Sequence, residues 1–195
     1  MSKAADLNAI LDLCDEEKIQ QWIELHPDII PDGKFVCDRW VLSKVPIGTK
    51  KITDLAFLHE TSGPWWFYMV ELARPVVQIF NKADEFTSGF HHEVQQVRDW
   101  IGDFRNHAQS LSSDTSVKFG ERFAQGLRLC SSIGMLFVGR RSELNNELRK
   151  KRWADFCESM YPHIEVRTYD HLVDVVARYE VINLFSLPQT QIGSL

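Results

Sequence analysis

The sequence predicts an α/β domain in which a mixed central sheet is flanked by helices. Two apolar runs, at residues 52–59 and 65–74, flank a short segment with a Gly-Pro pair, a pattern typical of a β-hairpin. Further along, apolar strand patterns alternate with stretches of helical spacing, of which residues 89–108 are the clearest. With 195 residues and a hydrophobic fraction of 44%, the chain suits one domain over residues 1–195.

The first half of the chain is expected to hold a helical region and then three antiparallel strands. Helical spacing covers about residues 4–25, with a break near Cys14 and a stop before Pro27. The strand WWFYMVEL is apolar on both faces apart from Glu71, which favours a central strand that is covered on both sides. The three expected strands span residues 34–45, 52–59 and 65–72.

The second half is expected to alternate helices and strands. The run SLSSDTS at residues 110–116 is typical of a loop after the helix of residues 89–108. Ser142, with Asn145 three residues later, is expected to cap the next helix. The remaining expectations are a helical extension at 1–14, a turn or short helix at 121–129, strands at 131–139 and near 164, a helix up to 180, and a loose tail at 183–195.

Composition and charge exclude several classes of protein. The net charge of −5 provides no global basic field for nucleic acid, although a local basic patch remains compatible with it. The four cysteines show no zinc-ligand spacing and are most simply reduced thiols. No apolar run is long enough to span a bilayer, and the N-terminus lacks the apolar core of a signal peptide. These observations predict a cytoplasmic protein without a membrane partner.

One carboxylate pair carries the chemical signal of the sequence. If the hairpin folds midway between Ser62 and Gly63, Asp54 lies directly opposite Glu71. Such paired residues point to the same face, with Cβ atoms roughly 4.5–5.5 Å apart, and Ala73 shares that face with Glu71. Two buried carboxylates need a cation or a proton to neutralise them, and oxygen ligands of this kind suit Mg²⁺ or Mn²⁺. Asp54 and Glu71 are therefore candidate metal ligands, and salt bridges at a sheet rim are an equally open interpretation of the residues alone.

Several segments, taken in order, form a pattern that can be compared with known protein families. They are HPDII after the first helix, VELARP at the end of the third strand, HHEVQQVRDW, LFVGRR and RTYDHL. Together with Asp54, they resemble the PD-(D/E)xK nuclease superfamily and, more narrowly, the nuclease domain of the Shedu (SduA) anti-phage defence family. The likeness covers roughly residues 15–179.

The resemblance implies a fold, a reaction and a set of site residues. The fold would be a restriction-endonuclease-like core, and the activity would be metal-dependent cleavage of DNA in defence against phage. Asp54 and Glu71 would hold the ion, and Gln96 and Trp100 would occupy the glutamine-and-aromatic pair on the following helix, with Gln96 facing the site. DNA would be the partner, and the chain would assemble as a homo-oligomer.

Position 73 departs from the pattern of the family. Ala73 stands where the resemblance places the catalytic lysine, which would orient the attacking water and stabilise charge on the phosphorane. An engineered inactivation, a natural loss of activity, or replacement by another cation (Lys82, Arg74 or Lys51) would each account for it. The intact surroundings favour engineering, because a decayed site would also have lost its carboxylates. The chain is then a catalytically impaired nuclease.

Plainer interpretations stand beside these assignments. Asp54 and Glu71 are also compatible with salt bridges at a sheet rim, and Gln96 with an ordinary polar helix position. Glu93, Glu17 and Glu24 are candidate additional ligands that no pattern singles out. Arg140, Arg141, Lys150 and Lys151 are the candidate DNA-binding side chains, and a solvated basic helix face is their simpler explanation. The rival function is a non-catalytic DNA-binding or assembly module with a degenerate nuclease fold.

Overall fold

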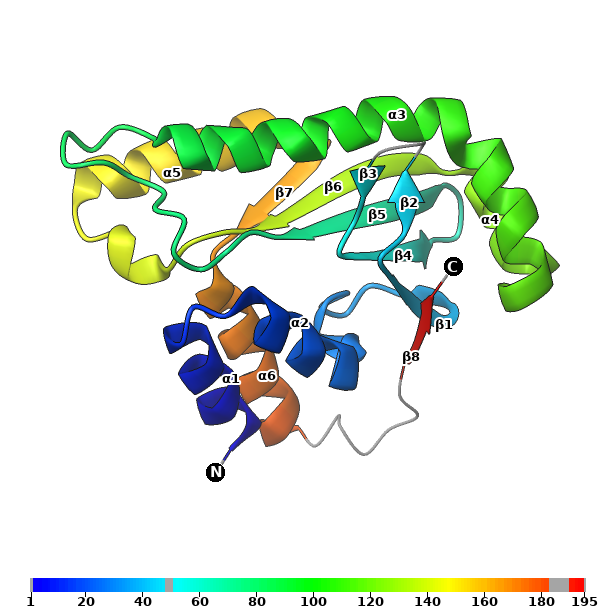
Figure 1. The fold of residues 1–195 in the computed structure, drawn as a ribbon, viewed down its shortest axis with the longest axis horizontal. Helices are drawn as coiled ribbons and strands as arrows, with labels where there is room; N and C mark the ends of the chain where they lie inside the picture. The colour runs from blue at the N-terminus through cyan, green and yellow to red at the C-terminus, as the bar shows by residue number, and fades with distance from the viewer. Residues whose placement is uncertain (1, 48–50, 183–189, 195) are drawn as a thin grey trace.

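The fold is built on one central mixed sheet with helices on both faces (Figure 1). The computed structural model describes residues 2–47, 51–182 and 190–194, without the side chains of residues 112–114, 116 and 117. The sheet has six strands in the order β7-β6-β5-β4-β1-β8. Their bounds are β1 Val36–Ser43, β4 Leu55–Glu60, β5 Trp65–Leu72, β6 Ser131–Phe137, β7 Ile164–Arg167 and β8 Gln191–Ser194.

Strand pairing follows the predicted meander in the first half of the chain. β1 pairs antiparallel with β4, and β4 pairs antiparallel with β5. The register of the hairpin runs from Leu55 opposite Val70 to Glu60 opposite Trp65, which is the register expected from the turn. β5, β6 and β7 are parallel to one another. The strand order places β5 between β6 and β4, in the middle of the sheet, as predicted. A small separate hairpin, β2 (Pro46–Ile47) with β3 (Lys51–Ile52), lies between β1 and β4 in sequence.

Helices cover the sheet in two layers. The long α3 (Ser88–Phe119) lies along one face with α4 (Glu121–Leu129) and α5 (Glu147–Met160). The opposite face carries α1 (Lys3–Asp12), α2 (Glu16–Leu25) and α6 (Tyr169–Val181). Two short 3-10 helices, η1 (Pro27–Ile29) and η2 (Arg141–Glu143), complete the described elements. The predicted break near Cys14 is confirmed, because that residue has φ 55° between α1 and α2.

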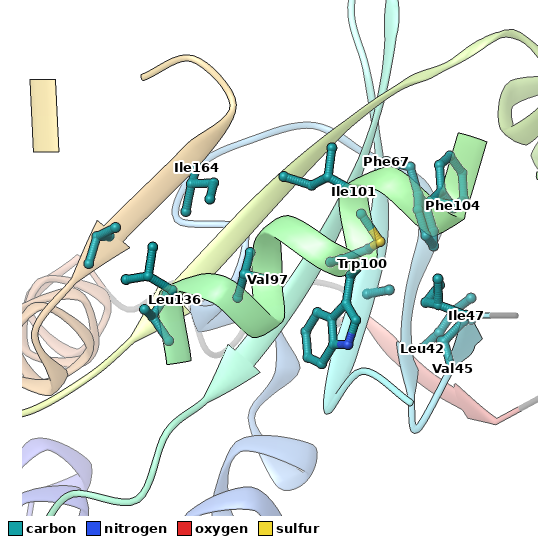
Figure 2. Close-up of a cluster of buried hydrophobic side chains, with 14 of the residues drawn as sticks. Leu42, Val45, Ile47, Phe67, Val97, Trp100, Ile101, Phe104, Leu136 and Ile164 are labelled. Atoms are coloured by element: carbon teal, nitrogen blue, oxygen red, sulfur yellow. The ribbon is translucent and has the colours of Figure 1, made fainter. Parts of the chain in front are cut away.

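Alternation along the strands separates the interior into two hydrophobic cores. On β5, Phe67 and Met69 face the α3 layer, whereas Tyr68 and Val70 face the layer of α1, α2 and α6. Figure 2 shows the α3 core, where Val97, Trp100, Ile101 and Phe104 point from α3 toward the sheet. The apolar stripe of residues 94–104 therefore has the role expected from its spacing.

The structure corrects two of the predicted elements in the second half of the chain. Residues 110–116 are helical rather than a loop, because Leu111, Thr115 and Phe119 continue the buried stripe of α3. Burial outweighs the weak helix preference of the serines there. Helix α5 begins at Glu147 and is capped by Asn146, whose side chain accepts from the backbone N–H of Arg149, so Ser142 is not the cap.

The C-terminal segment differs from the expected loose tail. Residues 191–194 form β8, which pairs parallel with β1 from Trp40 opposite Gln191 to Ser43 opposite Ser194. Residues 183–189 and Leu195 lie outside the described residues, so the prediction for them is not addressed. The described part of the tail thus supplies an edge strand of the sheet.

Candidate functional site

The structure brings Asp54 and Glu71 together at the end of the central hairpin. Asp54 directly precedes β4 and Glu71 is the penultimate residue of β5. The paired register ends one step earlier, at Leu55 opposite Val70, and the Asp54 N–H donates to the Val70 carbonyl at 3.2 Å. The residue exposures of Asp54 and Glu71 are only 8% and 9%. They share the strand face of Ala56, Met69 and Ala73, which belong to the α3 core. The hairpin thus brings the two carboxylates close together, with an irregular backbone hydrogen bond at Asp54.

Asp54 is held by partners at both carboxylate oxygens. The backbone N–H of Leu72 donates to Oδ2 at 2.8 Å. The ammonium of Lys44 donates to Oδ1, also at 2.8 Å. The backbone N–H of Lys44 in turn donates to the backbone carbonyl of Asp54 at 2.9 Å. Asp54 is thus fixed in orientation and carries a counter-ion.

Glu71 lies in a less favourable environment. Burial, and then the nearby charge of Asp54, raise the pKa of Glu71 from its ordinary 4.5 to about 9, and Glu93 and Glu16 act in the same direction. The positive charge of Lys44 opposes the shift. Glu71 is therefore a neutral carboxylic acid at pH 7 when no further cation is present.

Two more carboxylates complete an acidic cluster. Glu93 lies in the early turns of α3, and Glu16 is the first residue of α2. Burial raises the pKa of Glu93, with further contributions from Glu16 and Asp54, while His92 and Arg74 lower it. Within the described part of the chain, however, no three His, Cys, Asp or Glu side chains lie close enough to form a ready metal cage. The cluster thus offers a two-carboxylate site with additional negative charge around it.

Position 73 offers no polar side chain to the site. The Ala73 methyl is buried, its N–H donates to the carbonyl of Phe137 at 3.0 Å, and its carbonyl accepts from the Tyr169 hydroxyl at 2.7 Å. Of the three cations considered as replacements, Lys51 pairs with acids of α3, Arg74 is exposed near Glu93, and Lys82 is exposed in the loop after β5. In the described residues, the ion pair of Asp54 is with Lys44.

Sequence reasoning missed Lys44 and Glu16. Pairing of β1 with β4 places Ser43 opposite Leu55, and the next step of that register places Lys44 opposite Asp54. The inserted β2–β3 hairpin hides this register, because the connection is not a simple turn. On α2, the sequence pattern singled out no acid among Glu16, Glu17 and Glu24. In the structure it is Glu16 whose negative charge contributes to the raised pKa of Glu71.

Gln96 lies beside a pocket on helix α3. It is half-buried, one turn after Glu93, and borders a pocket of about 410 Å³. The pocket is also lined by Lys51, His92 and Asp99, together with Trp100 from the α3 stripe. The side of α3 that carries Gln96 is thus open to solvent next to β3.

The candidate DNA-binding residues are all engaged in ion pairs within the chain. Arg140 donates to Asp12 at 2.8 Å and to Asp170 at 3.3 Å, which ties the end of β6 to α1 and α6. Arg141 pairs with Asp174. On α5, Lys150 pairs with Glu147 at 2.7 Å and Lys151 with Asp155 at 2.6 Å. The two lysines are largely exposed and their pairs are of the weak surface kind, whereas Arg140 is mostly buried.

These features define a mixed α/β protein with a buried carboxylate pair at the end of its central hairpin. The family model described as "Shedu protein SduA, C-terminal" matches residues 14–173, so the chain belongs to this family. That membership suggests a role in anti-phage defence. No curated protein matches the chain. Among the described helices, none combines the length and apolar character needed to cross a membrane.

Proposed function

We propose that this chain is a metal-dependent DNA endonuclease domain of the PD-(D/E)xK type, acting in anti-phage defence, and that Ala73 impairs its catalysis. The observation that carries the proposal is the buried Asp54–Glu71 pair, a costly arrangement of the kind that concentrates at functional sites. Family membership and the resemblance of the surrounding segments support the same function. DNA and a second copy of the chain are the partners that this proposal includes.

The donor set fits a magnesium or manganese ion. Mg²⁺ usually binds through one or two carboxylates and keeps waters or substrate phosphates as its other ligands, so it does not need a closed protein cage. The Asp54 and Glu71 carboxylates would hold it, and it would polarise a phosphate oxygen and lower the pKa of a bound water. The Leu72 N–H would hold Asp54 in orientation for this purpose. Gln96, which lines a pocket on α3 one turn after Glu93, would position substrate or water.

With alanine at position 73, the site lacks the ammonium group that a lysine would supply there. A lysine at that position would share the strand face of Glu71 and could reach along it toward developing negative charge. The methyl group neither orients water nor stabilises an anion. We therefore expect the carboxylates to bind metal while the chemical step is slow.

Plasmid cleavage tests the proposal. In Mg²⁺ or Mn²⁺, we expect Ala73→Lys to cut about 10²–10³-fold faster than the parent chain, because a charge-stabilising donor is restored. Ala73→Met is the matched control, with similar length and no charge, and should not gain activity. Adding Glu71→Ala to the lysine variant should abolish cutting.

A second function is favoured by one specific observation. The absence of a cation at position 73 is what a non-catalytic DNA-binding or assembly module would show. If neither the parent nor Ala73→Lys cuts in any divalent metal, yet both bind DNA in a mobility-shift assay, this module replaces the nuclease. Cutting by the parent at the rate of the lysine variant would mean that another group replaces the lysine.

A further inference from the structure

We propose that Lys44 is a built-in counter-ion of the acidic site, which a divalent cation must displace from Asp54 in order to bind. The inference deepens the proposed function and rests on it, since it concerns the control of metal binding at the same carboxylate pair. It assigns a role to a residue that the sequence patterns did not single out. The role is a regulatory one, because Lys44 would set the metal concentration at which the site fills.

The backbone holds Lys44 in place for this contact. Lys44 has φ 51°, an uncommon conformation for a residue other than glycine and one that concentrates at functional positions. Its N–H donates to the carbonyl of Asp54, and the N–H of the adjacent Thr53 donates to the carbonyl of Val45, both at 2.9 Å. The main chains of the two partners are thus joined independently of their side chains. The ammonium therefore starts from a fixed point next to Asp54.

The charges around Asp54 explain why a counter-ion is needed. Asp54 is almost fully buried, and it lies within electrostatic reach of Glu93 and beside the buried carboxyl group of Glu71. The Lys44 ammonium at 2.8 Å from Asp54 Oδ1 forms the one ion pair of this aspartate among the described residues. A buried carboxylate without such a partner is strongly unfavourable. Lys44 thus stabilises the metal-free fold.

The same contact opposes a metal ion. A divalent cation on Asp54 would lie within a few ångströms of the ammonium on the same carboxylate, and like charges at that distance repel strongly in a partly buried site. Binding therefore requires the ammonium to leave Oδ1. The chain offers a route, because the Lys44 side chain is 52% exposed and borders a pocket of about 530 Å³ along α2. Glu16, Glu17 and Glu24 line that pocket and provide other carboxylates for the displaced ammonium.

Calorimetric titration with Mn²⁺ at low salt and neutral pH measures the competition directly. We expect Lys44→Met to bind Mn²⁺ about tenfold more tightly than the parent chain. Lys44→Asn should show the same gain and is the second variant, because asparagine tolerates a positive φ. Lys44→Arg keeps the charge and should leave the affinity near that of the parent.

Two controls locate the effect. Lys34→Met removes a lysine of the same charge whose ammonium lies 3.4 Å from Glu165, away from the site, and should leave Mn²⁺ affinity unchanged. Glu71→Gln should abolish the binding in each background. These controls separate a local competition from a general change in net charge.

The outcomes distinguish the two proposals. If Mn²⁺ binds in a Glu71-dependent manner and the Lys44→Met and Lys44→Asn affinities are unchanged or weaker, the counter-ion role is overturned while the metal site stands. If no variant shows Glu71-dependent Mn²⁺ binding, the metal site and the counter-ion role are both rejected. A gain in both neutral variants, absent from Lys44→Arg and Lys34→Met, supports displacement.

Discussion

Glu71 is the residue at which burial and charge conflict most strongly. Its carboxyl group is placed by strand alternation on the same face as Asp54, inside a layer that is otherwise apolar. The protein accommodates Glu71 by keeping it protonated, as its pKa of about 9 indicates, and accommodates Asp54 by pairing it with Lys44. Two neighbouring acids are therefore neutralised in different ways. Such a difference is common at functional sites, because it leaves one group ready to lose a proton when a cation binds.

The raised pKa of Glu71 predicts the pH dependence of stability without metal. Between pH 4.5 and about 9 the folded protein keeps a proton on Glu71 that the unfolded chain releases. The contribution of Glu71 to stability is therefore fully present below pH 4.5 and is lost as pH rises toward 9, at most by about 1.4 kcal/mol per pH unit. Glu71→Gln should remove this part of the pH dependence. In thermal melts with a chelator present, the melting temperature of the variant relative to that of the parent should therefore rise between pH 5 and pH 9.

A surface acid provides the comparison for that experiment. Glu147→Gln changes a side chain that is 90% exposed, and its difference from the parent should stay small and nearly constant with pH. A Glu71→Gln difference that is equally flat across the range would contradict the assignment of a buried, protonated Glu71.

At the scale of elements, α3 packs unusually close to β6. A Cβ atom added at Gly134 would lie 2.1 Å from Val97 Cγ1 and 3.3 Å from Ile101 Cδ1, both on the buried stripe of α3. Glycine at this strand position therefore lets the helix approach the sheet. Helix α3 also carries Glu93 and Gln96. The distance between α3 and the sheet therefore sets how far these two side chains lie from the carboxylates of the hairpin.

Substitution of two glycines tests that packing. Gly134→Ala should lower the free energy of unfolding by about 1–3 kcal/mol, because the added methyl overpacks the contact with Val97. Gly102→Ala, on the exposed side of α3 with nothing near its Cβ, should raise it by about 0.4–1 kcal/mol. Urea unfolding of both variants measures the difference. Equal effects of the two substitutions would rule out a close contact at Gly134.

At the scale of the whole molecule, the charge distribution opposes the proposed binding of DNA unless the negative charge is compensated. The chain carries a net charge of −5, its acidic cluster would repel phosphates, and the candidate basic residues are already paired with carboxylates. Under the proposed function, each of those cations would exchange an internal acid for a phosphate of the DNA. A divalent ion bound at the acidic cluster would neutralise part of this negative charge and would thereby favour the DNA-bound protein over the free protein.

Removal of three exposed cations tests this surface. The triple variant Arg141→Ala, Lys150→Ala, Lys151→Ala should bind DNA more weakly and reduce the slope of log affinity against log salt by about 2–3. Fluorescence anisotropy with labelled duplex at several salt concentrations measures the slope. A triple variant of Arg105, Lys118 and Arg128 has the same change in charge on α3 and α4, and an equal loss there would show that the binding is not local.

Much of the central hairpin could be predicted from sequence, because its information is local. A short turn sets the register, and strand alternation then decides which side chains share a face. The proximity of Asp54 to Glu71, the central place of β5 and the apolar stripe of α3 were confirmed in this way. The metal, DNA and catalytic roles of these residues stay predictions.

The tertiary structure alone decided which residues complete the site. Lys44 and Glu16 reach the carboxylate pair because β1 pairs with β4 around an inserted hairpin and α2 packs under the sheet. Residues 110–116 are helical and residues 191–194 form a strand because each gains buried contacts or partners far away in sequence. Local periodicity does not encode such long-range pairing. The sequence by itself therefore determined the acidic pair of this protein, because that pair depends on one short hairpin. Only the tertiary structure decided that Lys44 is its counter-ion, because this contact depends on how β1 pairs with β4.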